Sequence, residues 1–318
     1  MNLEEIRTVA VIGAGLMGHG IAQEFALAGY DVRLHDMDDE KLRMARENIQ
    51  ANFGLLITLG LITDAQARES HRHIVECAAL KDAASGADVV IEAVFEDLHL
   101  KREIFRRLDE LCPPRTILAS NSSSLLPGLL ASVTRRPEKV LVAHYFNPPY
   151  LLPLVEVVRH VKTSEETVRT VSGLLAKIGK TPVIVQKEVP GFIGNRLQAA
   201  LFREAMAIVR DGIATPEDVD VVVKNGFGRR LAAAGVFEIW EIAGWDLISA
   251  ICDNLFPSLD ASTGTPALLK EMIKRGELGT KTGKGFYEWT PGSVLALKKR
   301  IAQVLSRIAQ ERKTEPRT

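Results

Sequence analysis

The sequence predicts an α/β fold that continues into an all-α region. Short β-branched apolar runs alternate with amphipathic helical patterns as far as about residue 185. A glycine-rich turn, Gly13-Ala14-Gly15-Leu16-Met17-Gly18, follows the first run and precedes a helical pattern. Beyond Lys187 strand patterns disappear, and helical patterns alternate with glycine and proline. We therefore expect a first domain over residues 1–187 and a helical second domain over residues 188–318.

The first unit has the order strand, glycine turn, helix, with residues 6–12 as the strand. Gly13 permits the tight turn, Gly15 lets the backbone approach a pyrophosphate, and Gly18 lets the helix pack closely on the strand. The N–H groups at the start of that helix would face the phosphates. A glycine turn without a ligand is the alternative. The unit predicts a Rossmann-type nucleotide-binding domain.

An acidic residue then follows the second predicted strand, residues 31–35. Asp36 stands where a carboxylate accepts hydrogen bonds from an adenosine ribose. Asp38 and Asp39 lie close by and would repel the extra phosphate of NADP, so the expected cofactor is NAD. The alternative is an ordinary surface aspartate.

The remaining elements follow in chain order. Residues 39–59 and 63–74 predict a helical hairpin inserted in the nucleotide-binding domain, with an apolar tip at 53–62 that suits packing or a substrate lid. Further strands are expected at 88–93, 116–119, 140–143, 151–158 and 181–185, with helices at 98–111 and 164–178. In the second domain helices are expected at 192–209, 216–223, 237–251 and 266–274. A basic amphipathic tail, 291–310, would dock on the protein or on a second subunit.

The segment around His144 is where we expect the chemistry. An apolar run at 140–143 leads into His144, and Asn147-Pro148-Pro149 then interrupts regular structure. The next apolar run carries one carboxylate, Glu156, which would be costly to bury alone. If the chain turns back at the prolines, Glu156 orients the imidazole and the other ring nitrogen acts as a general base. A structural histidine is the alternative.

Polar residues also follow the strand at 116–119. Ser120-Asn121-Ser122-Ser123-Ser124 would lie at the carboxyl end of a strand, where open α/β sheets bind ligands. A serine-rich turn that caps a short helix is equally compatible with the pattern.

Composition excludes several classes of function. The chain has 318 residues, of which 46% are hydrophobic and 25% charged, and its 40 basic and 40 acidic side chains give no net charge. A basic field for nucleic acid or an anionic membrane is therefore not expected. Three cysteines without CxxC spacing suggest neither a disulfide framework nor a metal site. This cysteine usage favours a reducing, cytoplasmic setting. The acidic N-terminus does not resemble a signal peptide, and no apolar run is long enough for a membrane span.

Seven segments occur in order along the chain: the glycine turn, Glu92-Ala93-Val94-Phe95-Glu96 with Lys101, Ser120-Asn121-Ser122-Ser123-Ser124-Leu125, His144-Tyr145-Phe146-Asn147-Pro148, Pro153-Leu154-Val155-Glu156, Pro190-Gly191-Phe192-Ile193-Gly194-Asn195-Arg196, and Lys281-Thr282-Gly283-Lys284-Gly285-Phe286-Tyr287. With these segments the chain resembles the L-3-hydroxyacyl-CoA dehydrogenases over nearly its whole length.

The resemblance implies roles for individual residues. His144 would be the catalytic base, Glu156 its orienting partner, and Ser123 and Asn195 the contacts to the reacting oxygen. The resemblance also implies an NAD-dependent dehydrogenase with a helical domain that forms a homodimer. The NAD site would include Gly13, Gly15, Leu16, Met17, Gly18, Asp36, Glu96, Lys101 and Asn147.

Departures from the family pattern leave the substrate open. The family's CoA-contacting Ser and Lys in the hairpin align with Asn52 and Leu59, and its Gly-Pro-Phe-Glu reads Gly235-Val236-Phe237-Glu238. Other segments resemble the branch with lambda-crystallin, L-gulonate 3-dehydrogenase and L-carnitine dehydrogenase. Because the active-site motifs are complete, we expect reversible oxidation of a 3-hydroxyacyl-CoA, such as 3-hydroxybutyryl-CoA, to the 3-keto form. The alternatives are a dehydrogenase of a free hydroxy acid and a non-catalytic NAD-binding structural protein.

Overall fold

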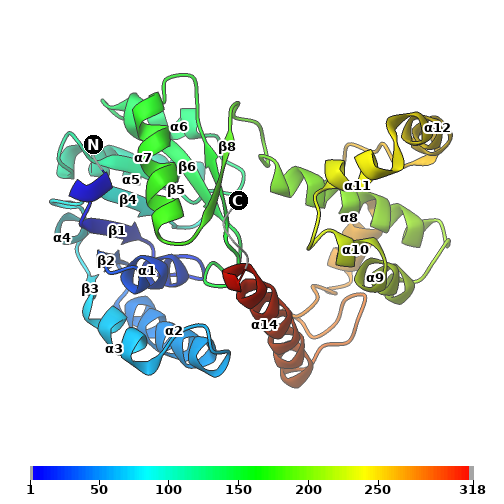
Figure 1. Ribbon diagram of the computed structural model, residues 1–318, viewed down its shortest axis with the longest axis horizontal. Coiled ribbons are helices and arrows are strands. Elements are labelled where there is room, and N and C mark those ends of the chain that lie inside the picture. The colour runs from blue at the N-terminus through cyan, green and yellow to red at the C-terminus, as the bar shows by residue number, and fades with distance from the viewer. Residues whose placement is uncertain (1–2, 315–318) are drawn as a thin grey trace. The chain divides into compact units, whose positions relative to one another are not determined.

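The computed structural model describes residues 3–314, and its sheet has eight strands in the order β3-β2-β1-β4-β5-β6-β7-β8 (Figure 1). Every neighbouring pair is parallel except β6 and β7, which are antiparallel. The strands are β1 (Thr8–Ile12), β2 (Asp31–His35), β3 (Ile74–Cys77), β4 (Val89–Glu92), β5 (Ile117–Ser120), β6 (Val140–Tyr145), β7 (Leu154–Val158) and β8 (Thr181–Val185).

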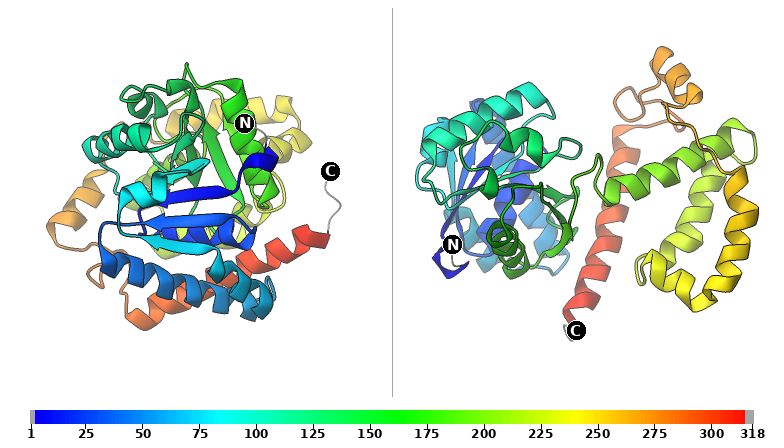
Figure 2. Two further views of the ribbon diagram at one scale, coloured as in Figure 1. Left: turned by 90° about the vertical axis from the view of Figure 1, so that its left-hand side faces the viewer. Right: turned by 90° about the horizontal axis from the view of Figure 1, so that it is seen from above.

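Helices cover both faces of this sheet (Figures 1 and 2). One face packs with α4 (Leu80–Ala84), α5 (Leu98–Leu111) and α6 (Pro127–Ala131), where Ile12, Val90 and Leu118 join Phe105 and Leu108 in one apolar cluster. The opposite face carries α1 (Gly18–Leu27) and α7 (Glu165–Lys177). The central strands are buried on both faces, which explains their continuous apolar sequences. The predicted Rossmann-type fold is thereby confirmed.

The inserted hairpin consists of α2 (Asp39–Thr58) and α3 (Asp64–Arg72). Asp38 caps α2, and Thr63 forms a capping box with Gln66 at the start of α3. At the tip, Gln310 Nε2 donates to Leu59 O over 2.7 Å, so the end of the C-terminal helix α14 (Pro291–Thr314) contacts the hairpin. The tail was expected to dock on the protein or on a second subunit, and this contact lies within the chain itself.

The described residues form two compact units. One comprises residues 3–195 and 305–314, and the other comprises residues 196–304. The second unit is helical, as expected. It contains most of α8 (Gly194–Arg210), then α9 (Pro216–Asn225), α10 (Phe227–Arg230), α11 (Val236–Ala243), α12 (Trp245–Leu255), α13 (Ala267–Lys274) and the start of α14. Short 3₁₀ turns lie at Leu3–Glu5 and Pro137–Lys139 in the first unit and at Phe256–Ser258 in the second. The boundary expected near Lys187 remains a prediction.

Several predicted boundaries were wrong. The helix expected over 237–251 is broken at Gly244, whose φ of 87° ends α11 before α12 begins. The helix expected to reach residue 74 ends at Arg72, and the next residues form β3 instead. β6 continues through His144 to Tyr145 because it pairs with β7, which begins only at Leu154.

Within residues 3–314 no helix is both long and apolar enough to cross a membrane.

Candidate active site

The carboxyl ends of four neighbouring strands carry the candidate residues. The glycine turn follows β1, Glu92 to Glu96 follow β4, the serine-rich turn follows β5, and His144 lies near the end of β6. Main-chain contacts join these ends: Ala93 N donates to Ile12 O, and Asn121 N donates to Glu92 O, each over 2.7 Å. The ligand edge expected for an open α/β sheet is therefore assembled within one unit.

Two glycines of the turn are required by the fold itself. A Cβ on Gly13, whose φ is +104°, would lie 2.7 Å from Ala93 O, and a Cβ on Gly18 would lie 1.7 Å from Gly13 O. Gly15 differs, because a Cβ there would meet nothing within 4 Å. The backbone at Gly15 is exposed, and the open space beside it can take a pyrophosphate at the start of α1. The residues of the turn therefore fit a dinucleotide.

Asp36 is held against this turn. Its Oδ2 accepts from Ala14 N over 3.0 Å, and its Oδ1 accepts from Asp38 N over 3.2 Å. Lys41 Nζ lies 3.9 Å from the same Oδ1. The turn and the carboxylate expected to bind the adenosine ribose thus form one local assembly.

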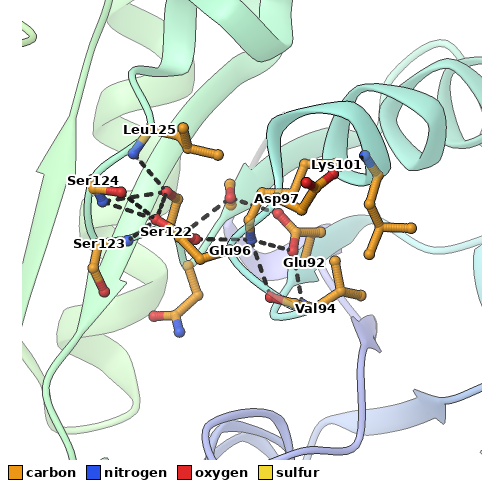
Figure 3. A network of polar contacts seen from close by, with 12 residues as sticks. Glu92, Val94, Glu96, Asp97, Lys101, Ser122, Ser123, Ser124 and Leu125 are labelled. Atoms are coloured by element: carbon orange, nitrogen blue, oxygen red, sulfur yellow. Dashed lines mark hydrogen bonds and ion pairs between the residues drawn. The ribbon is translucent and has the colours of Figure 1, made fainter. Parts of the chain in front are cut away.

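Glu96 is the centre of the polar network shown in Figure 3. Its Oε1 accepts from the N–H groups of Ser123 and Ser124, at 3.0 and 2.9 Å, and from the hydroxyls of Ser122 and Ser124. Burial raises the pKa of Glu96, but the hydrogen bonds from Ser122 and Ser124 and the charge of Lys101 outweigh burial and lower it. An ionised Glu96 therefore fixes the serine-rich turn.

A fully buried ion pair supports the same loop. Lys101 Nζ donates to Glu92 Oε1 over 2.7 Å and to Val94 O over 3.2 Å, and it lies 3.4 Å from Glu96 Oε2 (Figure 3). Ser120 Oγ donates to Glu92 Oε2 over 2.6 Å. Lys101 is 1% exposed, so its ammonium holds the loop from inside. Sequence reasoning missed the role of Glu92, although a glutamate closing a buried strand was a usable signal.

His144 and Glu156 face each other across β6 and β7 in direct register. His144 Nδ1 lies 2.8 Å from Glu156 Oε2, and Glu156 Oε1 accepts from the N–H groups of Ile193 and Gly194, each over 2.9 Å. Burial raises the pKa of Glu156, but the bonds from His144 and the two N–H groups lower it overall. Glu156 is thus an ionised acceptor, which places the proton on Nδ1 and leaves the Nε2 lone pair available.

The structure also brings Ser123 and Asn195 together. Asn195, in the first turn of α8, donates from Nδ2 to Ser123 O over 3.3 Å. The hydroxyl of Ser123 is exposed and has no hydrogen-bond partner among residues 3–314. Asn147 is exposed three residues beyond His144. The Phe146 and Phe192 rings pack on the His144 imidazole, with centroids 4.8 and 5.5 Å away.

Comparison with known proteins identifies the family. Residues 8–189 match the model for the NAD-binding domain of 3-hydroxyacyl-CoA dehydrogenase, and residues 191–289 match that for its C-terminal domain. The chain belongs to the 3-hydroxyacyl-CoA dehydrogenase family. It is accordingly an NAD-dependent oxidoreductase that acts on a CH–OH group, which confirms the predicted family, cofactor and enzyme class.

Three relatives indicate the breadth of this likeness. A probable 3-hydroxybutyryl-CoA dehydrogenase of Bacillus subtilis (strain 168) is 38% identical over 90% of this chain and 98% of the relative. A lambda-crystallin homolog of Homo sapiens is 38% identical over 77% of each chain. A crystal structure of 5-formyl-3-hydroxy-2-methylpyridine 4-carboxylic acid 5-dehydrogenase, described as an NAD+-dependent dismutase, has a TM-score of 0.91 at 32% identity and covers 98% of this chain and 100% of its own.

Proposed function

We propose that this family member reversibly oxidises the secondary hydroxyl of a 3-hydroxyacyl-CoA, such as 3-hydroxybutyryl-CoA, to the 3-keto form. The observation that carries the proposal is the buried His144–Glu156 pair beside the serine-rich turn. A carboxylate on Nδ1 leaves Nε2 free to take a proton, which is the arrangement a general base requires.

Each residue of the site has a distinct role in this proposal. NAD, when bound, supplies the nicotinamide carbon that accepts a hydride. His144 Nε2 takes the hydroxyl proton, and Glu156 orients the ring and stabilises the imidazolium that forms. Ser123 Oγ and Asn195 Nδ2 hold the reacting oxygen. The glycine turn and Asp36 bind the dinucleotide, with Glu96, Lys101 and Asn147 beside the nicotinamide half.

A free carboxylic acid is the second candidate substrate. The matches to the family models end at residue 289 and so do not include α14. The 5-formyl-3-hydroxy-2-methylpyridine 4-carboxylic acid 5-dehydrogenase structure, by contrast, matches 98% of this chain and 100% of its own. In the hairpin, the Asn52 amide donates to Gln23 Oε1 over 2.9 Å, and Leu59 offers no charge. These features support the second candidate, a substrate without CoA.

One assay distinguishes the candidates. NADH absorbance is followed with acetoacetyl-CoA, then in the oxidative direction with 3-hydroxybutyrate, gulonate, carnitine and a hydroxymethylpyridine carboxylate. Turnover of the thioester alone supports the first candidate, and turnover of a free acid alone supports the second. His144→Ala should lower turnover by at least ~10²-fold while NADH binding persists. Turnover close to wild type in a folded His144→Ala variant would exclude the proposed base.

We also propose that the protein is a homodimer through residues 196–304. This unit leaves large apolar side chains in water, including Phe237 at 78%, Ile242 at 87% and Phe256 at 63% exposure. An exposed apolar surface of this kind is typical of a subunit interface. Sedimentation velocity should give twice the chain mass, and Ile242→Glu should shift it to the monomer. Val161→Glu is the control, because Val161 is 92% exposed in the other unit.

A further inference from the structure

Lys180 is a buried lysine outside the candidate active site. It precedes β8 and is 8% exposed. Its Nζ donates to Pro149 O over 2.6 Å and forms an ion pair with Glu24 of α1, whose side chain is 11% exposed. One ammonium therefore joins three segments: helix α1, the loop after β6, and the start of β8.

The loop after β6 also packs directly on α1. A Cβ on Gly20 would lie 2.7 Å from Pro149 Cγ, so this contact is possible only because residue 20 is glycine. Pro148 O accepts from the N–H groups of Leu151 and Leu152, each over 3.1 Å. The loop is thus an ordered segment seated on the helix.

These contacts connect two parts of the site. Helix α1 begins at Gly18, at the end of the dinucleotide turn, whereas the loop begins directly after the strand that carries His144. Tyr145, the residue after His144, is 2% exposed, and burial together with the charge of Glu24 raises its pKa. Because side chains alternate along a strand, Tyr145 lies on the face of the sheet opposite His144.

We propose that Lys180 and Glu24 are a positioning pair that holds residues 147–150 against α1 and so fixes His144 relative to the bound dinucleotide. The inference rests on the proposed role of His144. Burying two charges costs desolvation that an apolar pair would avoid, so stability alone does not explain them. Placement does, because hydride and proton transfer require reacting atoms held about 3–3.5 Å apart.

The test uses the full chain with Lys180→Met, which keeps most of the side-chain length and removes the ammonium. Lys177→Met is the matched control, because Lys177 pairs with Glu4 at the exposed end of α7. The substrate is whichever compound the wild type converts. We expect kcat of Lys180→Met to fall by about 10²-fold, with the NADH dissociation constant nearly unchanged. The primary isotope effect with 4-deuterated NADH should rise, because hydride transfer becomes slower than the other steps.

Hydrogen exchange at Leu151 and Leu152 provides a readout that needs no substrate. Lys180→Met should speed exchange of these two amides by at least about tenfold, whereas Lys177→Met should not. If unpaired Glu24 prevents folding, Glu24→Gln with Lys180→Met removes both charges and should show the same defects in a folded protein.

Three results would overturn the inference. One is wild-type kcat and wild-type exchange in the charge-free variants. Another is a loss of NADH affinity as large as the loss of kcat/KM, since that would make Lys180 part of cofactor binding. The third applies if the wild type converts none of the substrates tested, an outcome that contradicts the proposed function but not the inference. In that case amide exchange at Leu151 and Leu152 is measured with and without NADH. Exchange rates unchanged by Lys180→Met refute the inference, whereas faster exchange that NADH no longer slows supports it.

Discussion

Replacing Glu156 with glutamine should abolish most activity without unfolding the protein. Glutamine retains an oxygen for the N–H groups of Ile193 and Gly194, which now donate to Glu156 over 2.9 Å. Its amide must then donate to His144 Nδ1, now 2.8 Å from the carboxylate. The imidazole is forced into the tautomer with its proton on Nε2 and can no longer accept one there. We expect kcat to fall roughly 10³- to 10⁴-fold, as for a wrong tautomer in a serine protease triad.

The assay compares kcat, the NADH dissociation constant and urea unfolding. NADH affinity should stay near wild type, and the free energy of unfolding should fall by about 1–2 kcal/mol for the weakened hydrogen bonds. Glu165→Gln is the control, because its carboxylate is exposed and pairs with Arg159 at the surface. A folded Glu156→Gln variant with more than about a tenth of wild-type kcat would refute the tautomer argument.

The same variant has a pH signature. The folded-state pKa of Glu156 lies below its ordinary value of 4.5, so its ionisation stabilises the fold above that pH. This contribution is lost as the pH falls through the folded pKa. The difference in unfolding free energy between wild type and Glu156→Gln should therefore shrink as the pH falls below about 4.5.

Three further predictions concern other parts of the fold. Gly15→Ala should fold normally yet weaken NADH binding at least about tenfold, whereas Gly18→Ala should lower the melting temperature, because only its Cβ collides with backbone. Lys101→Met should cost about 3–5 kcal/mol in urea unfolding by leaving Glu92 charged and unpaired, and Glu92→Gln in the same chain should recover part of it. Burial raises the pKa of Cys112 from 9.0 to about 11, so wild type should lose roughly 2–3 kcal/mol relative to Cys112→Ala as the pH rises from 9 to 11; parallel curves would contradict this.

Local patterns predicted the parts of the fold that local chemistry determines. The glycine turn, the buried central strands and the capped helices of the first domain each depend on residues close together in the sequence, and they were predicted correctly. Strand β3 was missed because its four residues, half exposed, pair only with β2 at the sheet edge. The break at Gly244 was missed because glycine within a helical pattern is compatible with both a helix and its end.

The candidate site divides in the same way. The contact between His144 and Glu156 could be inferred because the prolines turn the chain back and a buried carboxylate needs a partner. The network around Glu96 could not, since its partners Ser122 and Ser124 lie on another strand end and only the sheet order brings them together. Lys180 escaped notice for the same reason: its partner Glu24 lies at the other end of the domain sequence.

The antiparallel pairing of β6 and β7 limits how this enzyme can change over time. His144 and Glu156 are cross-strand neighbours, so the ladder of main-chain hydrogen bonds sets their distance. Residues can be gained or lost in the connecting loop without harm if both strands keep their alignment. A slip of one residue would turn Glu156 to the far side of the sheet and leave the histidine without its acceptor. Neighbouring loops can therefore diversify toward new substrates while the proposed proton-transfer pair is inherited intact.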